Sequence, residues 1–270
     1  MKDLRDNFRL YLLCIALSLR GQMQYRASFF LYSLGQFVAI GIEFIGLWAL
    51  FHRFGNLKGW TLAEVALLYG MVNVAFSIAD TFGRGFDTFS GLVKNGEFDR
   101  LLTRPRPTTL MVAAREFPAM RIGRLLQGAI VLVWAAIALQ VHWTIPKIFL
   151  LVGAIIGGAC TFIGLFVLQA TLCFWTIESL EIVNAVTYGG TLTAQYPMTI
   201  YRPWFRYFFT FVIPLACLNY IPVSALLDRQ ATLGVPEAFP YFAPFIGVLF
   251  LLMSLRVWKF GERKYCSTGS

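Results

Sequence analysis

Glu43 is the residue whose type and position most clearly indicate chemistry in this chain. It lies inside a long apolar run, residues 29–50, where an ionised side chain costs roughly 2.5 to 3.5 kcal/mol in a bilayer. Such a carboxyl group can line a polar cavity, pair with Asn73 in the next apolar run, or remain protonated and hydrogen-bonded. We therefore take Glu43 and Asn73 as candidates for a translocation path through the apolar part of the chain.

The sequence contains no motif that is typical of an enzyme active site. No stretch matches G-x-x-x-x-G-K-[ST], the phosphate-binding loop of ATPases. The two histidines, His52 and His142, fall at the ends of apolar runs, whereas a serine hydrolase in the membrane would need one beside a serine at depth. The five cysteines have no paired C-x-x-C spacing, and no cluster has the spacing of zinc ligands. We therefore predict that the chain is not an enzyme and carries no cofactor or metal of its own.

A basic segment, residues 82–107, separates the second and third apolar runs. Four of its apolar residues recur at helical spacing: Phe82, Phe86, Phe89 and Val93. This spacing predicts a short amphipathic helix that can lie along a membrane surface. Asn95-Gly96 predicts a turn, 97–102 predicts further helical turns, and the Arg-Pro repeat at 104–107 ends them. We call residues 83–107 the elbow; its charged and apolar side chains suit a contact with a soluble partner.

The composition is typical of an integral membrane protein. Hydrophobic residues make up 58% of the chain and charged residues 14%, against about 25% charged residues in soluble proteins. A transmembrane helix needs roughly 20 apolar residues, so residues 1–270 have room for about six spans in one all-α domain. The spans that we predict are 29–50, 62–82, 122–141, 148–175, 204–220 and 241–258. Trp258, which closes the last span, is among the tryptophans that we assign to an interfacial aromatic belt.

The distribution of basic residues predicts the orientation of these spans. Residues 1–27 have helical spacing and mixed charge, which predicts an interfacial helix; a cleaved signal peptide is the competing interpretation. Most of the 23 Lys and Arg residues fall in this segment, in and just after the elbow, before the fifth predicted span and after residue 255. By the positive-inside rule, both termini and the elbow are cytoplasmic. The net charge of +9 therefore reflects membrane orientation, and we expect no nucleic-acid partner.

Two further patterns concern helix packing. The fourth predicted span carries a ridge of small residues, namely Gly153, Gly157, Thr161 and Gly164, which lets another helix of the same chain or of a second copy approach closely. Five prolines between residues 214 and 244 interrupt an apolar region. We expect either a short re-entrant element near residues 221–227 or a plain proline-rich connection there.

Several short motifs together resemble a known family. They are KNGEFDRLLTRPRP in the elbow, Phe174-Trp175, Tyr196-Pro197, Ile213-Pro214, Tyr220-Ile221-Pro222 and the ending GERKYCSTGS. With them the whole chain resembles an ABC-2 type exporter permease, in the branch of uncharacterised permease components and of viologen or multidrug exporters. This resemblance implies a six-span half-transporter of the type V exporter class in a bacterial inner membrane. It also implies a second related permease chain, in a heterodimer or homodimer, and two copies of a cytoplasmic ATPase that bind ATP and Mg²⁺.

The resemblance also implies a role for the elbow. In this family the segment between the second and third spans is a coupling helix that docks into a groove on the ATPase. Carried over to this chain, the coupling residues are Arg84, Lys94, Glu97, Phe98, Asp99, Arg100 and Arg104. The cargo implied is a hydrophobic, amphipathic or cationic compound that is moved out of the cytoplasm.

Two functions from other classes stay open at this point. A stand-alone secondary carrier or channel would ordinarily need more polar residues at membrane depth for ion coupling or conduction. A membrane scaffold subunit without transport activity has no sequence requirement that this chain violates. An ATPase that accompanies the chain would separate the exporter from both alternatives.

Overall fold

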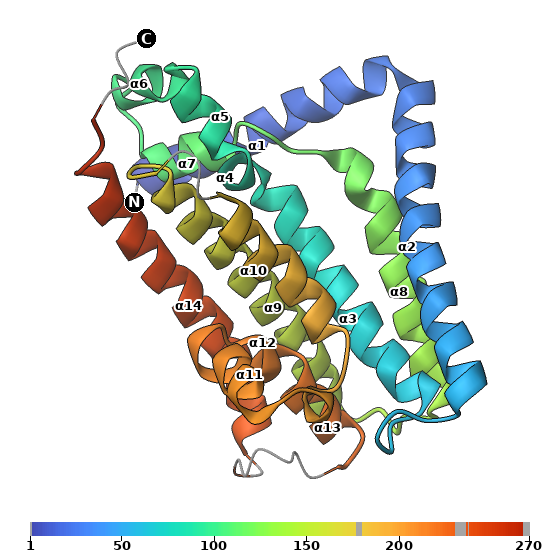
Figure 1. The fold of residues 1–270 in the computed structure, drawn as a ribbon. Coiled ribbons are helices and arrows are strands. Elements are labelled where there is room, and N and C mark those ends of the chain that lie inside the picture. The colour runs from blue at the N-terminus through green and yellow to red at the C-terminus, as the bar shows by residue number, and fades with distance from the viewer. Residues whose placement is uncertain (1, 177–179, 230–235, 237, 267–270) are drawn as a thin grey trace.

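Long apolar helices lie side by side in a computed structural model of the chain, which describes residues 2–176, 180–229, 236 and 238–266. The main helices in Figure 1 are α2 (Arg26–Phe54), α3 (Leu62–Phe82), α8 (Ile122–Ala138), α9 (Ile145–Leu172), α10 (Leu180–Ala194) and α14 (Phe239–Glu262). Five candidate spans are long and apolar enough to cross a membrane, and a bent pair over 203–226 would make six. No strand forms in these described ranges. The prediction of an all-helical membrane protein is confirmed.

The central helix of the bundle is α3, which is buried along most of its length. It begins at a capping box, because Thr61 Oγ1 accepts a hydrogen bond from the Glu64 N–H, and a Glu64 carboxylate oxygen accepts one from the Thr61 N–H. α3 packs against α8 on one side and α9 on another. The approach to α8 requires glycine, since a Cβ on Gly70 would lie 2.7 Å from the backbone nitrogen of Leu132.

The ridge of small residues on α9 packs against α14 of the same chain. A Cβ on Gly157 would lie 2.7 Å from the carbonyl oxygen of Pro244, and one on Gly164 would lie 2.8 Å from the Phe250 ring. The contact is reciprocal, because a Cβ on Gly247 of α14 would overlap with the carbonyl oxygen of Gly157. Of the two interpretations left open, intramolecular packing is the one that the structure supports.

We expect Gly247→Ala to separate α9 from α14 and to destabilise the protein by about 1–3 kcal/mol, the usual cost of overpacking. The added methyl group meets backbone atoms, which cannot rotate away. The midpoint of thermal unfolding in detergent should fall measurably. Gly41→Ala on α2 is the matched control, since its Cβ would meet no atom within 4 Å. Equal midpoints for the two variants would refute this account of the packing.

The prediction that residues 204–220 form the fifth span as a single helix is wrong. The chain forms α11 (Pro203–Tyr207), a π-helix η3 (Phe208–Val212), α12 (Leu215–Leu218) and the start of α13 (Tyr220–Leu226). The helices on the two sides of Pro214 are bent by 72° relative to each other. Ile213 has an extended backbone, with φ −117° and ψ 102°, as is favoured before a proline. The short helix expected near residues 221–227 is present as α13.

Between α9 and α14, the chain passes from one end of the bundle to the other through α10 and not through residues 204–220. α10 runs beside α9 in the opposite direction (Figure 1). α9 ends where Phe174 packs against Phe89 and Phe98 of the elbow. After α10, the backbone oxygens of Thr199 and Ile200 accept hydrogen bonds from Lys58 in the loop between α2 and α3. Residues 180–194 therefore connect the two ends of the bundle. Arg202 and Arg206, which the positive-inside rule predicts on the elbow side, lie at the opposite end.

We call that opposite end the distal end. It contains the loop before α3, the segment after α10 with η2 (Met198–Ile200), and residues 227–229, which directly follow α13. Arg229 ties these parts together, because its Nη2 lies 2.7 Å from Glu64 Oε1 and its guanidinium carbon lies 5.1 Å from the centre of the Trp60 ring. Lys147 Nζ pairs with Asp228 Oδ2 at 2.8 Å. These ion pairs hold the broken helices α11–α13 onto the bundle.

At the other end, α1 (Lys2–Gln24) and the elbow cover the tops of the long helices (Figure 1). α1 is separated from α2 by a turn at Tyr25, and its Ser18 and Gln22 side chains both donate hydrogen bonds to the carbonyl oxygen of Phe117.

The elbow forms three short helices and not one continuous helix: α4 (Arg84–Asp87), α5 (Phe89–Lys94) and α6 (Glu97–Leu102). The predicted turn is confirmed, with Gly96 at φ 65°. After the elbow come α7 (Thr108–Ala113) and the 3₁₀ turn η1 (Ala119–Arg121).

Candidate functional sites

Six aromatic side chains attach the elbow to the bundle. We call this group the aromatic cluster: Phe86, Phe89, Phe98, Phe174, Trp258 and Tyr265. Trp258 lies at its centre and is fully buried, with ring centroids 4.9 Å from both Phe89 and Phe174. Phe98 is also fully buried and packs edge-on against Phe89 and Tyr265, each at 5.0 Å. Aromatic pairs in this geometry contribute roughly 0.5–1.5 kcal/mol each beyond the area that they bury. The elbow is therefore fixed to the end of α9, to α14 and to the residues after α14.

The aromatic cluster corrects two predictions. Trp258 does not belong to an interfacial belt, because its ring is covered by the elbow, and its Nε1 donates a hydrogen bond to Thr108 Oγ1 at 3.5 Å. Phe98 does not present a docking surface, because its side chain has no exposed area. The apolar spacing of the elbow predicted a face that lies along a membrane surface. In the structure Phe86, Phe89 and Val93 are instead buried against other parts of the chain, and Phe82 stays exposed.

A charged network joins the beginning of the elbow to four other elements. Arg84 Nη1 lies 2.6 Å from Asp87 Oδ2 and 3.3 Å from Asp80 Oδ1. Asp80, which is almost fully buried, also pairs with Arg121 of η1 at 2.8 Å. The Tyr188 hydroxyl of α10 donates to Asp87 at 3.0 Å. We call these five residues the charged network.

The network also reaches α9, because Gln169 Nε2 donates to Asp87 Oδ1 at 3.3 Å and to Asn184 Oδ1 at 2.9 Å. Burial raises the pKa of Asp87, while the Arg84 guanidinium opposes that shift. A movement of α4 must therefore move or break contacts to α3, η1, α9 and α10. Arg84 positions the elbow and offers little surface to a partner.

Three of the predicted coupling residues of the elbow have exposed side chains, and we call these three residues the basic face: Lys94, Arg100 and Arg104. Glu97 is engaged within the chain, in an ion pair with Arg115. Burial raises the pKa of the Tyr265 hydroxyl, and the neighbouring Asp99 carboxylate raises it further. The basic face therefore presents cations outward, while Glu97 helps to hold the elbow in place.

Glu43 lines a cavity of about 340 Å³ between α2, α3 and α10. Its neighbours there include Tyr69, Leu192, Gln195 and Tyr196. The Tyr69 hydroxyl donates to the carbonyl oxygen of Ile40 at 2.8 Å, which fixes the ring at the wall of the cavity. A carboxyl group beside aromatic rings in a partly apolar cavity can hold an organic cation.

Asn73 does not line this cavity. It is fully buried, and its amide donates to the Tyr69 carbonyl oxygen at 2.9 Å and accepts from Arg124 Nε at 3.0 Å. Asn73 therefore joins α3 to α8, and the pairing with Glu43 is not formed. The sequence contained one indication that Arg124 has a buried partner, because this arginine lies within the third predicted span, 122–141, and not before it. Its guanidinium lies 4.4 Å from the centre of the Phe76 ring.

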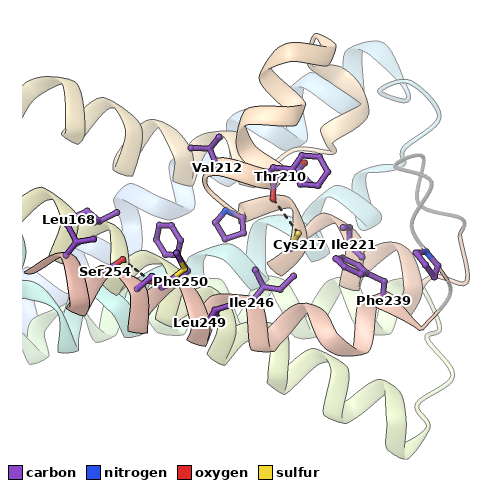
Figure 2. A pocket seen from close by; sticks show the side chains of 15 residues that line it. Leu168, Thr210, Val212, Cys217, Ile221, Phe239, Ile246, Leu249, Phe250 and Ser254 are labelled. Atoms are coloured by element: carbon purple, nitrogen blue, oxygen red, sulfur yellow. Dashed lines mark hydrogen bonds between the residues drawn. The ribbon is translucent and has the colours of Figure 1, made fainter.

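A larger cavity of about 770 Å³ lies between η3 and α14, with Leu168 of α9 in its wall (Figure 2). Its lining is almost entirely apolar, and the hydroxyl and thiol groups in it are already bonded. Ser254 Oγ donates to the Phe250 carbonyl oxygen at 2.9 Å, and Cys217 Sγ lies 3.6 Å from the Thr210 carbonyl oxygen. This cavity offers hydrophobic contact but no group that would orient a charged molecule, and Glu43 is not part of it.

Comparisons with known proteins give one match. Residues 37–269 match the family described as ABC-2 family transporter protein. No curated protein and no solved structure matches the chain. The matched region contains the elbow, both cavities and all the helices from α3 to α14.

Proposed function

The chain belongs to the ABC-2 family of transporter proteins, and from this premise we propose that it is the membrane-spanning permease subunit of an ATP-driven exporter. The observation that carries the proposal is the elbow, a polar surface that is rigidly attached to the ends of several long helices. ATP and Mg²⁺ are bound by a separate cytoplasmic ATPase. Two copies of that ATPase serve two permease chains, this one and a related second chain or a second copy.

In this proposal the elbow transmits movement from the ATPase to the helices. The ATPase contacts the basic face, the aromatic cluster carries the displacement to α9 and α14, and the charged network carries it to α3 and α10. Coupling requires that ATP favour one arrangement of the helices over another. A rigid attachment serves this purpose, because a loose elbow would move without changing the energy of the bundle.

The elbow end faces the cytoplasm of a bacterium in this proposal, with both termini on that side of the inner membrane. Lys and Arg residues are concentrated at that end, in α1, in the elbow and in the last turns of α14. Arg202 and Arg206 lie at the distal end, which reduces the excess of Lys and Arg at the elbow end but does not reverse it. The broken helices α11–α13, held by Arg229, close the outer side.

The cavity beside Glu43 is the proposed translocation path. Its carboxyl group, with Tyr69 and Tyr196 nearby, suits an amphipathic organic cation more than a bulky glycan. The apolar cavity next to α14 is not part of the path, because it lacks any group that would bind the charge of such a substrate.

We expect Glu43→Gln to raise the substrate concentration at half-maximal transport about 10-fold for a cationic substrate, which corresponds to about 1.4 kcal/mol. The variant keeps the shape of the side chain and removes its charge. Transport is measured in vesicles that contain the permease and its ATPase. An uncharged analogue of the same substrate is the control and should be transported as before. Equal transport of the cation by both proteins would remove Glu43 from the path.

Vesicles of this kind also test the proposed function as a whole. With the co-purified ATPase, uptake into inverted vesicles should require ATP and stop when the catalytic residues of the ATPase are replaced. Transport by this chain alone, driven by an ion gradient, would establish a secondary carrier. A stable complex without any transport would favour a scaffold subunit.

A further inference from the structure

We propose that the elbow end of α14 and the start of α7 form a binding site for the headgroup of an anionic phospholipid. A cavity of about 230 Å³ lies there, lined by Leu102, Arg106, Pro107, Thr108, Thr109, Lys259 and Glu262. This site shares no residue with the basic face or with the Glu43 cavity. The inference does not depend on transport activity, and it requires only that α14 is a membrane span.

The polar groups of this cavity suit a phosphate diester. Arg106 and Lys259 bring positive charge from two different elements, and Thr109 adds a hydroxyl donor. Arg106 is held in position, because one of its guanidinium nitrogens donates to Asn7 Oδ1 of α1 at 2.8 Å. Its other N–H groups form no side-chain hydrogen bond with the residues that the structure describes. Glu262 also lines the cavity and offsets one of the two charges. The net charge of the lining is positive, which favours an anion.

On the face of α14 that carries Lys259, the exposed residues near the elbow are charged and those farther from the elbow are apolar. Arg256 and Arg263 are exposed near Lys259. Further along the helix come the exposed residues Tyr241, Phe245, Val248 and Leu252, at steps of four, three and four, with Lys259 seven residues after Leu252. Residues at these spacings share one face of a helix.

This order of groups selects a phospholipid over other anions. A headgroup phosphate at Arg106 and Lys259 would place an acyl chain along the apolar face, where lipid is the solvent. A free phosphate would use only the cavity, and an acidic protein would leave the apolar face without a partner. A general preference for cytoplasmic Lys and Arg explains the charges, but not their convergence with a threonine on one cavity.

The test measures lipid binding to the intact purified protein, with any partner chains that accompany it, by native mass spectrometry and thermal unfolding. The probes are phosphatidylglycerol, phosphatidylcholine with the same acyl chains, and inorganic phosphate. Phosphatidylglycerol should bind at least about 10-fold more tightly than phosphatidylcholine and should raise the unfolding midpoint. The double variant Arg106→Gln, Lys259→Gln should bind it about 30-fold more weakly, at about 1 kcal/mol per cation.

A matched control removes two exposed cations of α1 at the same end of the bundle. The variant Arg9→Gln, Arg20→Gln has the same loss of charge outside the cavity and should keep the preference for phosphatidylglycerol. If the first double variant does not fold, Glu262→Gln serves instead and should bind phosphatidylglycerol more tightly. Equal binding of the two lipids, an equal loss in the α1 control, or stabilisation by inorganic phosphate as large as that by phosphatidylglycerol would each overturn the proposal.

Discussion

Reversing the charges of Arg100 and Arg104 to Glu is expected to weaken binding of the ATPase at least about 100-fold, because like charges brought together at an interface cost several kcal/mol. Both side chains are exposed on the basic face and form no ion pair in the described ranges of the chain. The membrane bundle should therefore fold as before. Binding is measured from the amount of ATPase that co-purifies with the tagged permease, and the fold is checked by thermal unfolding.

The choice of these two arginines follows from the structure of the elbow. Charge reversal at Glu97 and Asp99 would also disturb docking, but it would break the ion pair between Glu97 and Arg115 that helps to hold the elbow, and it would change the charge beside Tyr265. Arg53→Glu, an exposed residue at the distal end, is the control for charge reversal. If the Arg100 and Arg104 variant retains the ATPase as well as the control does, the basic face is not the docking surface.

Replacement of Arg84 by Met is expected to lower the free energy of unfolding by about 3–5 kcal/mol, the usual result of removing one partner from a buried ion pair. Asp80 keeps its contact with Arg121, but Asp87 loses the only arginine that pairs with it in the part of the chain that the structure describes. Since Arg84 connects the elbow to α3, transport should fall more than ATP hydrolysis does. Thermal unfolding and the ratio of substrate moved to ATP hydrolysed are the two measurements.

The pH dependence of this variant gives an independent check. Burial raises the pKa of Asp87, and without Arg84 the opposing effect is lost, so the pKa rises further. A buried carboxyl group with a raised pKa destabilises the folded state in its charged form, so the destabilisation grows as pH rises through that pKa. We therefore expect a smaller loss at pH 5 than at pH 8, and Asp87→Asn should restore part of the stability at pH 8. A loss that neither acid nor Asp87→Asn reduces would mean that Arg84 acts through packing alone.

The spans with continuous apolar composition could be predicted from the sequence, and α10 could not. α2, α3, α8, α9 and α14 overlap the predicted ranges because each contains a long apolar run. α10 is only 15 residues long and contains several threonines and glycines. Two of its three threonine hydroxyls are bonded inside the helix, as Thr191 and Thr193 donate to carbonyl oxygens four residues earlier, whereas the buried Thr187 hydroxyl has no hydrogen-bond partner among the described residues. A hydropathy argument counts such residues as polar, although they cost little once bonded.

The candidate sites show a similar limit. Helical spacing predicted that one face of the elbow is apolar, but it did not reveal that Phe174, Trp258 and Tyr265 cover that face, because those residues lie far away in the sequence. Glu43 could be identified from the sequence because it is an acidic residue inside a long apolar run. Its neighbours Gln195 and Tyr196 could not be assigned to the cavity while α10 was unrecognised.

The most direct test of the central claim is photo-crosslinking from the elbow in native membranes. A photoreactive amino acid replaces Arg104 on the basic face in one variant and Arg53 at the distal end in another, and the crosslinked proteins are identified. We predict that position 104 captures a P-loop ATPase and that position 53 does not. Capture of no ATPase at position 104, in cells where transport is intact, would contradict the assignment of the elbow as the coupling surface.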